Sequence, residues 1–127
     1  MIDGKQRQPR VLVLDDDSNI LSAFSDFLKK EQCIMIAASS SEEALRKLEE
    51  RRIDLLITDI RLSAQSGVTF FLNAKALYPS LPTIIMTGYP EFVNEQEILS
   101  LGADCFLLKP LDLEKLRKAV RLCLHTK

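Results

Sequence analysis

Long hydrophobic segments are absent from this sequence. No apolar run approaches the roughly 18 residues that a membrane-spanning helix needs. The N-terminal stretch MIDGKQRQPR is polar and lacks the apolar core that a signal peptide contains. We therefore expect neither a membrane span nor a secretory leader, and we expect the protein to be cytoplasmic.

Cysteine and histidine are also scarce, and the net charge is small. The three cysteines, Cys33, Cys105 and Cys123, are widely spaced and flanked by apolar residues, which is typical of buried thiols rather than of disulfides or a metal site. The single histidine, His125, has no companion for a ligand role, so we expect it at the surface. A net charge of −1 argues against a surface dedicated to nucleic acid or membrane.

The length and composition predict a single globular domain. The chain has 127 residues, of which 46% are hydrophobic and 28% are charged, an ordinary balance for one domain with one core. The sequence shows no internal repeat and no low-complexity segment. We expect an N-terminal tail over residues 1–9, a domain over 10–124 and a C-terminal tail over 125–127.

Apolar runs alternate with segments of helical spacing. Continuous apolar runs are typical of strands that are covered on both faces, as in a parallel sheet. They lie at 11–14, 33–38, 55–58, 83–87 and 105–108, and the helical segments lie near 20–28, 44–48, 68–72, 91–101 and 113–124. The alternation predicts a doubly wound (βα)5 domain of the α/β class with a central parallel sheet.

Capping residues predict where two of these helices begin, and the composition of a third predicts weak packing. Ser40 followed by Glu43 predicts a capping box, and Asp112 predicts the N-cap of the last helix. The segment 91–101 is largely polar, and only a few residues supply an apolar face. We therefore expect this helix to be thinly anchored.

Polar residues stand where the predicted strands end, and ligands of such sheets bind at this edge. They are Asp15, Asp16 and Asp17 after the first strand, Asp59 after the third, Thr87 and Gly88 after the fourth, and Lys109 and Pro110 after the fifth. Carboxylates about 5 Å apart repel by roughly 3 kcal/mol per pair at an effective dielectric near 20. Lys109 is the only nearby cation, so the expected counterion is Mg²⁺.

This set of groups is suited to phosphoryl transfer. Mg²⁺, a lysine and a hydroxyl can position and neutralise the transferred oxygens, and a carboxylate can itself accept the group as an acyl phosphate. Asp59 is the better candidate acceptor, because it stands alone on the central strand while the acids after the first strand can hold the metal. Asp17 is expected to be a helix N-cap.

Residues 10–124 resemble the receiver domain of response regulators, the CheY-like phosphorylated partner of a sensor histidine kinase in two-component signalling. Five signatures coincide in order. They are the acidic pair Asp15 and Asp16, Asp59 in TDIRL, Gly67, Thr87 in MTGY, and Lys109 with Pro110 in FLLKP. The resemblance implies a flavodoxin-like fold with strand order 2-1-3-4-5.

The resemblance also implies what the chain does. Asp59 would accept a phosphoryl group from a phosphohistidine of a sensor kinase or of a histidine phosphotransfer protein, and the domain would switch conformation to control an output. Mg²⁺ would be bound by Asp15, Asp16 and Asp59 with the main-chain carbonyl of Arg61. The domain would not be an enzyme beyond Mg²⁺-dependent self-phosphorylation and self-dephosphorylation, and it would contact neither nucleic acid nor membrane.

The remaining matching positions would support the reaction and the switch. Thr87 and Lys109 would bind phosphoryl oxygens, and Pro110 would be the cis-proline that orients the lysine. Phe106 would turn inward when Thr87 moves toward the phosphoryl group, and Gly67 would have a structural role. A homodimer could form through the fourth helix, fifth strand and fifth helix. Its ion pairs could join Arg117, Lys118 and Arg121 to Glu95 or Glu97.

The chain departs from the family pattern in the loop after the third strand. Ser63 stands where members usually carry proline, and Gln65 stands where an apolar residue is common, so we expect a looser loop. Arg61 and Tyr89 are bulky and border the path of attacking water by family resemblance. We therefore expect both side chains to slow hydrolysis of the phosphorylated state.

Three other functions fit parts of the sequence. A haloacid-dehalogenase-type phosphatase would use acids at Asp15 and Asp17, but Asn19 replaces the expected threonine or valine and a cap domain does not fit in 127 residues. A flavodoxin-like FMN binder needs a phosphate loop after the first strand, where the acidic DDDSN would repel phosphate. A degenerate receiver would act only as a phosphorylation-independent interaction module.

Overall fold

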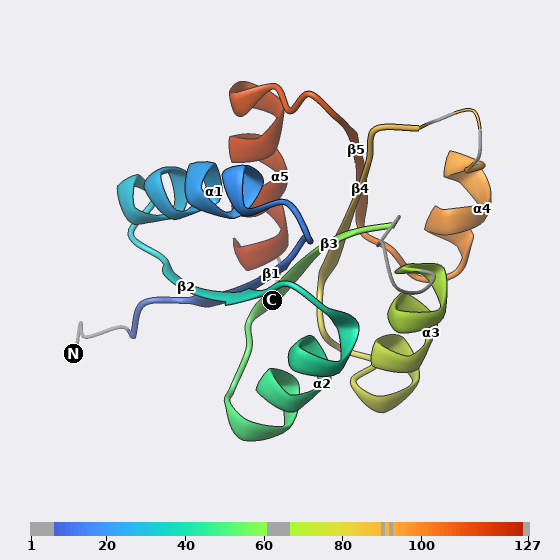
Figure 1. Ribbon diagram of the computed structural model, residues 1–127, viewed down its shortest axis with the longest axis horizontal. Coiled ribbons are helices and arrows are strands. Elements are labelled where there is room, and N and C mark those ends of the chain that lie inside the picture. Colours follow the sequence, from blue (N-terminus) through green and yellow to red (C-terminus); the bar gives the residue numbers. More distant parts are fainter. Residues whose placement is uncertain (1–6, 61–66, 90, 92, 126–127) are drawn as a thin grey trace.

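The computed structural model describes residues 7–60, 67–89, 91 and 93–125. Five strands alternate with five helices (Figure 1). The strands are β1 (Arg10–Leu14), β2 (Ile34–Ala38), β3 (Leu55–Asp59), β4 (Thr83–Thr87) and β5 (Cys105–Leu108). The helices are α1 (Ser18–Lys30), α2 (Ser41–Glu50), α3 (Gly67–Leu77), α4 (Glu95–Ser100) and α5 (Leu113–His125). All strand pairs are parallel and the order is β2-β1-β3-β4-β5, which confirms the predicted doubly wound fold.

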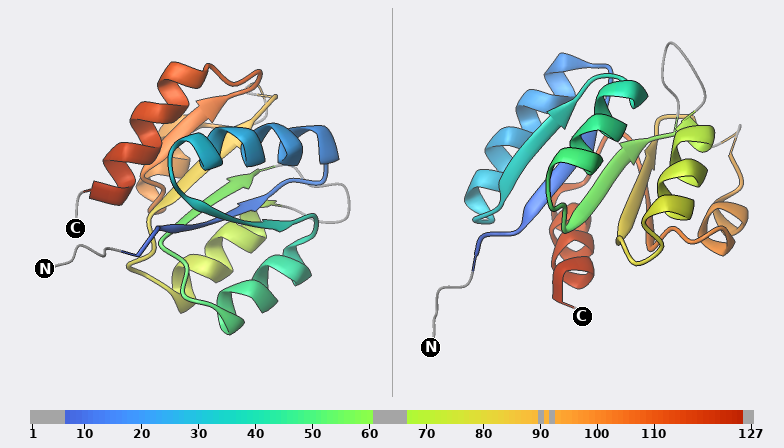
Figure 2. Two further views of the ribbon diagram at one scale, coloured as in Figure 1. Left: turned by 90° about the vertical axis from the view of Figure 1, so that its left-hand side faces the viewer. Right: turned by 90° about the horizontal axis from the view of Figure 1, so that it is seen from below.

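Each central strand is buried on both faces because helices cover both sides of the sheet. α1 and α5 lie on one side, and α2, α3 and α4 lie on the other (Figures 1 and 2). Successive side chains of a strand point to opposite faces. Val11 and Val13 therefore pack in the core under α1 and α5, while Leu12 and Leu14 pack under α2 and α3. The apolar runs that predicted the strands reflect this two-sided burial.

Side-chain caps set the helix starts. Asp17 caps α1, accepting a hydrogen bond from the amide of the residue after next, and Asp112 accepts two amides at the start of α5. Ser40 caps α2 by accepting the amide of Glu43, whose carboxylate accepts the amide of Ser39 instead of that of Ser40. The predicted caps are confirmed. In the capping box of α2, however, the glutamate binds the amide of the residue before the cap and not that of the cap itself.

α4 is short and weakly held, as the sequence predicted. It begins at Glu95, after the side chain of Asn94 caps it, and Ile98 is its buried residue. Leu99 and Leu101, which we expected on its apolar face, are 37% and 41% exposed. Phe92, also expected there, lies outside the described residues. Few buried contacts leave a helix with low local stability.

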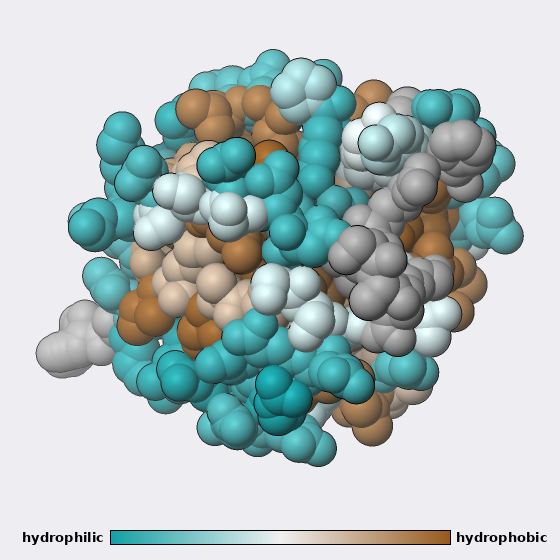
Figure 3. All heavy atoms as spheres, in the orientation of Figure 1, coloured by the Kyte–Doolittle hydropathy of each residue, from teal (hydrophilic) through white to brown (hydrophobic). Residues whose placement is uncertain are grey.

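The two edges of the sheet are less buried than its centre. Figure 3 shows apolar surface along β2, the edge strand between α1 and α2, where Ile34 is 42% exposed. At the other edge, β5 is half-buried and Leu108 is 51% exposed. His125 is exposed, as expected. Within the described ranges, every helix is too short or too polar to cross a membrane.

The three thiols are free, and none belongs to a disulfide. Burial raises the pKa of Cys33, of Cys105 and of Cys123, the last from 9.0 to about 12. Because the thiolate is the reactive form, the reactive fraction of Cys123 at neutral pH falls by on the order of a thousandfold. We expect Ellman's reagent to label the folded protein slowly and the guanidinium-unfolded chain at once. Rapid labelling of all three thiols in the folded protein would show that burial does not protect them.

Candidate functional site

Three carboxylates meet at the C-terminal edge of the sheet. β1 and β3 are neighbours with Leu14 opposite Thr58, so the residues that follow and end these strands come together. Each of Asp15, Asp16 and Asp59 offers an oxygen atom, and these atoms all lie within 4.8 Å of one another. Asp15 and Asp59 are buried and Asp16 is exposed. The acids that the sequence singled out therefore form one cluster.

Lys109 reaches this cluster from the end of β5. Its Nζ lies 2.8 Å from Asp15 Oδ2 and 2.7 Å from Asp59 Oδ2. The other oxygen of Asp15 accepts the amide of Asp17 at 2.9 Å. Burial raises the pKa of Asp15 although the bond from Lys109 opposes the shift. Burial would lower the pKa of Lys109, but its two carboxylate bonds outweigh this and raise it.

A backbone hydrogen bond fixes the main chain of Lys109 next to the end of β4. The Lys109–Pro110 peptide bond is cis, as expected, and the Lys109 amide donates to the carbonyl oxygen of Thr87 at 2.8 Å. This bond extends the pairing of β4 with β5 past the end of β5. The ammonium therefore approaches the two aspartates from the edge of the sheet.

Thr87 ends β4, the neighbour of β3. Its side chain is fully buried, and its Oγ1 accepts the amide of Tyr89 at 3.0 Å. In the part of the chain that the structure describes, the hydroxyl proton of Thr87 has no acceptor. Buried hydroxyls normally donate to a partner, so this proton is available to a group that binds beside Asp59.

Phe106 lies on β5 and Gly67 lies at the start of α3. Phe106 is half-buried on β5, opposite Ile85, and packs against the apolar cluster that includes Ile85 and Ile98. Gly67 begins α3, and a Cβ placed on it would lie 2.4 Å from the carbonyl oxygen of Ile60. This close approach to the backbone next to Asp59 explains why glycine is required. Arg61, Ser63 and Gln65 lie outside the described residues.

The donor set fits a hard divalent cation. The cluster offers carboxylate oxygens, the ligands that Mg²⁺ prefers. The cluster holds three carboxylates, and the ammonium of Lys109 binds two of them, those of Asp15 and Asp59. Asp16, the exposed member, faces solvent, from which an ion would arrive with its remaining waters.

A match to a known protein family identifies the domain that carries this site. The family model described as "Response regulator receiver domain" matches residues 11–121. The chain belongs to this family. The comparisons lend nothing to a phosphatase, an FMN binder or a phosphorylation-independent module, and the resemblance inferred from five short motifs is confirmed.

Relatives and solved structures agree with the assignment. The receiver domain is 33% identical over 117 residues to the transcriptional regulatory protein ZraR of Escherichia coli O157:H7 and 31% identical over 117 residues to PrrA of Mycobacterium bovis. These alignments cover 91% and 92% of this chain but 26% and 50% of the relatives, so the chain spans a fraction of their length.

Two solved structures illustrate the likeness in three dimensions. A receiver domain protein of Clostridium thermocellum is 31% identical with a TM-score of 0.84, covering 91% of this chain and 94% of that one. The response regulator TrrA of Thermotoga maritima, solved with Mg²⁺ and BeF, is 27% identical with a TM-score of 0.83. That alignment covers 92% of this chain and 100% of TrrA.

Both arginines that we expected at a homodimer interface form ion pairs within the chain. Arg117 and Arg121 lie on α5 and bind the two carboxylate oxygens of Glu31 at 3.3 and 3.0 Å. Glu31 follows α1, so these ion pairs join α1 to α5. The homodimer stays a prediction, and of the three basic residues expected to serve it, Lys118 is exposed on α5.

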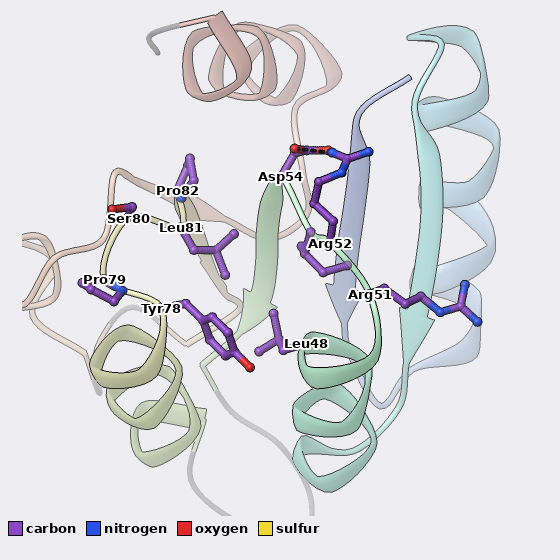
Figure 4. A pocket seen from close by; sticks show the side chains of 10 residues that line it. Leu48, Arg51, Arg52, Asp54, Tyr78, Pro79, Ser80, Leu81 and Pro82 are labelled. Carbon is purple, nitrogen blue, oxygen red and sulfur yellow. Dashed lines mark hydrogen bonds and ion pairs between the residues drawn. The ribbon is translucent and has the colours of Figure 1, made fainter. Parts of the chain in front are cut away.

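A cavity of about 390 Å³ lies at the opposite edge of the sheet, between the C-terminal ends of α2 and α3 (Figure 4). Leu48, Tyr78 and Leu81 line it, and Arg52 at its border is bound to Asp54 at 2.6 Å. The cavity is thus far from Asp59, which ends β3, because Asp54 precedes the same strand. The acidic cluster lies instead at the C-terminal edge of the sheet.

Proposed function

We propose that Asp59 is the residue on which this receiver domain accepts a phosphoryl group, donated by a phosphohistidine of a sensor kinase or of a histidine phosphotransfer protein. The observation that carries the proposal is the ammonium of Lys109, held 2.7 Å from Asp59 Oδ2 and 2.8 Å from Asp15 Oδ2. The buried Thr87 ends β4, the neighbour of β3, and its hydroxyl has a proton available to a new acceptor.

In the proposed reaction, a carboxylate oxygen of Asp59 attacks phosphorus. A P–O bond forms, the P–N bond to the donor histidine breaks, and its electron pair stays on the imidazole nitrogen. Lys109 pairs with one oxygen of the transferred group, and the Thr87 hydroxyl donates a hydrogen bond to another. Both groups therefore stabilise negative charge where it develops. Lys109 is bound to Asp59 before the reaction, which lowers the cost of reorganisation.

Asp15, Asp16 and Asp59 would hold Mg²⁺, together with the carbonyl of Arg61. When bound, the ion supplies positive charge that neutralises the transferred oxygens. The protein's own contribution is to hold the carboxylates at the C-terminal ends of β1 and β3 within reach of one another.

The same site would drive the switch. Thr87 would move toward the phosphoryl group, and Phe106 would turn into the space that it leaves. Phe106 packs against the apolar cluster that contains Ile98, the buried residue of the short helix α4, so a change in Phe106 would reach the cluster that anchors this helix. A two-state element biased by a new charge is the general form of such a switch.

The wider predictions follow from this role. The chain would be a regulator that catalyses no reaction beyond its own Mg²⁺-dependent phosphorylation and dephosphorylation. It would work in the cytoplasm, with its functional domain over residues 10–124, and could pair through α4, β5 and α5. In a longer protein it would control an output domain.

Intact-mass spectrometry after incubation with acetyl phosphate and Mg²⁺ tests the proposal. We expect a gain of one phosphoryl mass, which is absent without Mg²⁺ and absent in Asp59→Asn. Asp26→Asn, which alters an exposed aspartate of α1, is the matched control and should be phosphorylated normally. If no adduct forms, and beryllofluoride also fails to bind, the domain is a phosphorylation-independent interaction module.

The side chain of Tyr89 is expected to prolong the phosphorylated state. It is 50% exposed and lies two residues after Thr87, and by family resemblance this position borders the path of the attacking water. Tyr89→Ala should speed the loss of phosphate severalfold, measured as decay of the phosphorylated mass. Tyr78→Ala, which alters the cavity at the other edge of the sheet, should leave the decay unchanged. Equal rates for Tyr89→Ala and the unmodified protein would contradict the idea, and the same expectation holds for Arg61→Ala.

A further inference from the structure

The Thr87 hydroxyl has a partner that no motif predicts. Oγ1 accepts the main-chain N–H of Tyr89 at 3.0 Å across the intervening Gly88, a local turn in which a threonine side chain binds the amide two residues on. No hydrogen bond joins this hydroxyl to Asp59 among the residues that the structure describes. The resting hydroxyl is therefore directed by the backbone that follows β4.

The main chain of Thr87 is held in place, so its hydroxyl can move only by rotation of the side chain. Its carbonyl oxygen accepts the amide of Lys109 at 2.8 Å, and its side chain is fully buried at the end of β4. A threonine side chain is confined to a few staggered positions about χ1. Moving Oγ1 toward Asp59 thus requires a rotation of the side chain that breaks the bond to Tyr89.

We infer that the main-chain N–H of Tyr89 is a positioning group that holds the Thr87 hydroxyl in its resting orientation and must be released for the switch. The inference rests on the proposed function, because it assigns a second group to the same conformational change. Tyr89 acts here through its amide, so the effect is independent of the ring that shields the site. The residue after Gly88 would set how readily the domain adopts its activated state.

The size of the effect follows from the worth of one hydrogen bond. A net contribution typical of an intramolecular hydrogen bond corresponds to about a fivefold change in an equilibrium constant. Deleting the N–H should therefore raise the ratio of activated to resting conformers about fivefold. A ligand that binds only the activated conformer should bind more tightly by the same factor, as long as that conformer is the minor one.

The sharpest test replaces Tyr89 by its α-hydroxy acid analogue, which changes the N–H to an ester oxygen and keeps the side chain. Tyr89→Ala is the matched control, because it removes the side chain and keeps the N–H. Tyr89→Pro deletes the N–H by an independent route, which guards against a defect peculiar to the ester. Two readouts apply: the affinity for beryllofluoride with Mg²⁺, and the methyl resonance of Thr87 in the protein without Mg²⁺ or beryllofluoride.

We expect the ester and Tyr89→Pro to bind beryllofluoride about fivefold more tightly and to shift the Thr87 methyl resonance toward its beryllofluoride-bound position. Tyr89→Ala, which loses the ring but keeps the N–H, is the reference for Tyr89→Pro and should leave the Thr87 methyl resonance at its resting position. Unchanged affinity and unchanged resonance in both N–H deletions would overturn the inference. So would an amide of Tyr89 that stays protected from hydrogen exchange in the beryllofluoride complex, because the bond would then move with Thr87. If beryllofluoride fails to bind the unmodified protein, the proposed function itself fails.

Discussion

Replacing Lys109 by methionine is expected to destabilise the protein by about 2–4 kcal/mol. The ammonium is bound to Asp15 Oδ2 and Asp59 Oδ2, and the side chain of Asp15 is 0% exposed. Removing one partner of a buried ion pair leaves a charge without compensation, which costs more than the pair contributed. The 19% exposure of Lys109 places the cost below that of a fully buried pair. Urea unfolding measures the difference.

Two further variants separate the ion pair from a general effect of losing lysine. Lys115→Met alters an exposed lysine of α5 and should change the free energy of unfolding by no more than about 0.5 kcal/mol. Asp15→Asn placed in Lys109→Met removes the buried charge and should recover part of the lost stability. If the double variant were less stable than Lys109→Met by the full cost of Asp15→Asn alone, the two residues would not be coupled.

Lys109→Met should also change the chemistry in two opposite directions. Without the ammonium, the three carboxylates carry more negative charge, so Mg²⁺ should bind more tightly in a calorimetric titration. Phosphorylation by acetyl phosphate should nevertheless slow by on the order of a hundredfold, because a group that stabilises the transferred oxygens is lost. Weaker Mg²⁺ binding together with slower phosphorylation would instead indicate that the cluster had collapsed.

The residues of the site could be predicted because they stand at strand ends. The burial of β1, β3 and β4 on both faces produces apolar runs whose ends are visible in the sequence, and the parallel topology brings those ends to one edge. Asp15, Asp59 and Lys109 thus came together from three distant segments. The half-buried state of β5 was not visible, because its apolar run resembles the others while its position at the sheet edge depends on the fold.

Interactions of the main chain left no such signal. The amides of Tyr89 and Asp17 bind Thr87 and Asp15, but almost any residue type supplies an N–H, so composition is silent about them. The pairing of Glu31 with Arg117 and Arg121 was missed for a different reason. It joins residues 86 and 90 positions apart, and the helical spacing of charges on α5 does not identify which neighbouring element they face.

Gly67→Ala is expected to reduce stability by about 3 kcal/mol and to weaken Mg²⁺ binding in the same protein. A Cβ at this position would lie 2.4 Å from the carbonyl oxygen of Ile60 and 2.6 Å from that of Asp59. Both are backbone atoms, so no side chain can rotate away and the start of α3 or the end of β3 must move. Because Asp59 ends β3, the displacement reaches the acidic cluster. Urea unfolding and a Mg²⁺ titration give the two values.

The other glycines supply graded controls for this prediction. At Gly88 the nearest atom to an added Cβ is Lys109 Cβ at 3.7 Å, an ordinary contact, so Gly88→Ala should be within about 0.5 kcal/mol of the unmodified protein. Gly102 has φ +117, and an added Cβ would lie 2.8 Å from Lys75 Cε. Gly102→Ala should therefore lose stability through backbone strain while keeping its affinity for Mg²⁺, because this turn precedes β5 at the opposite edge. Equal loss of Mg²⁺ affinity in Gly67→Ala and Gly102→Ala would mean that general destabilisation, and not the contact with Ile60, links Gly67 to the site.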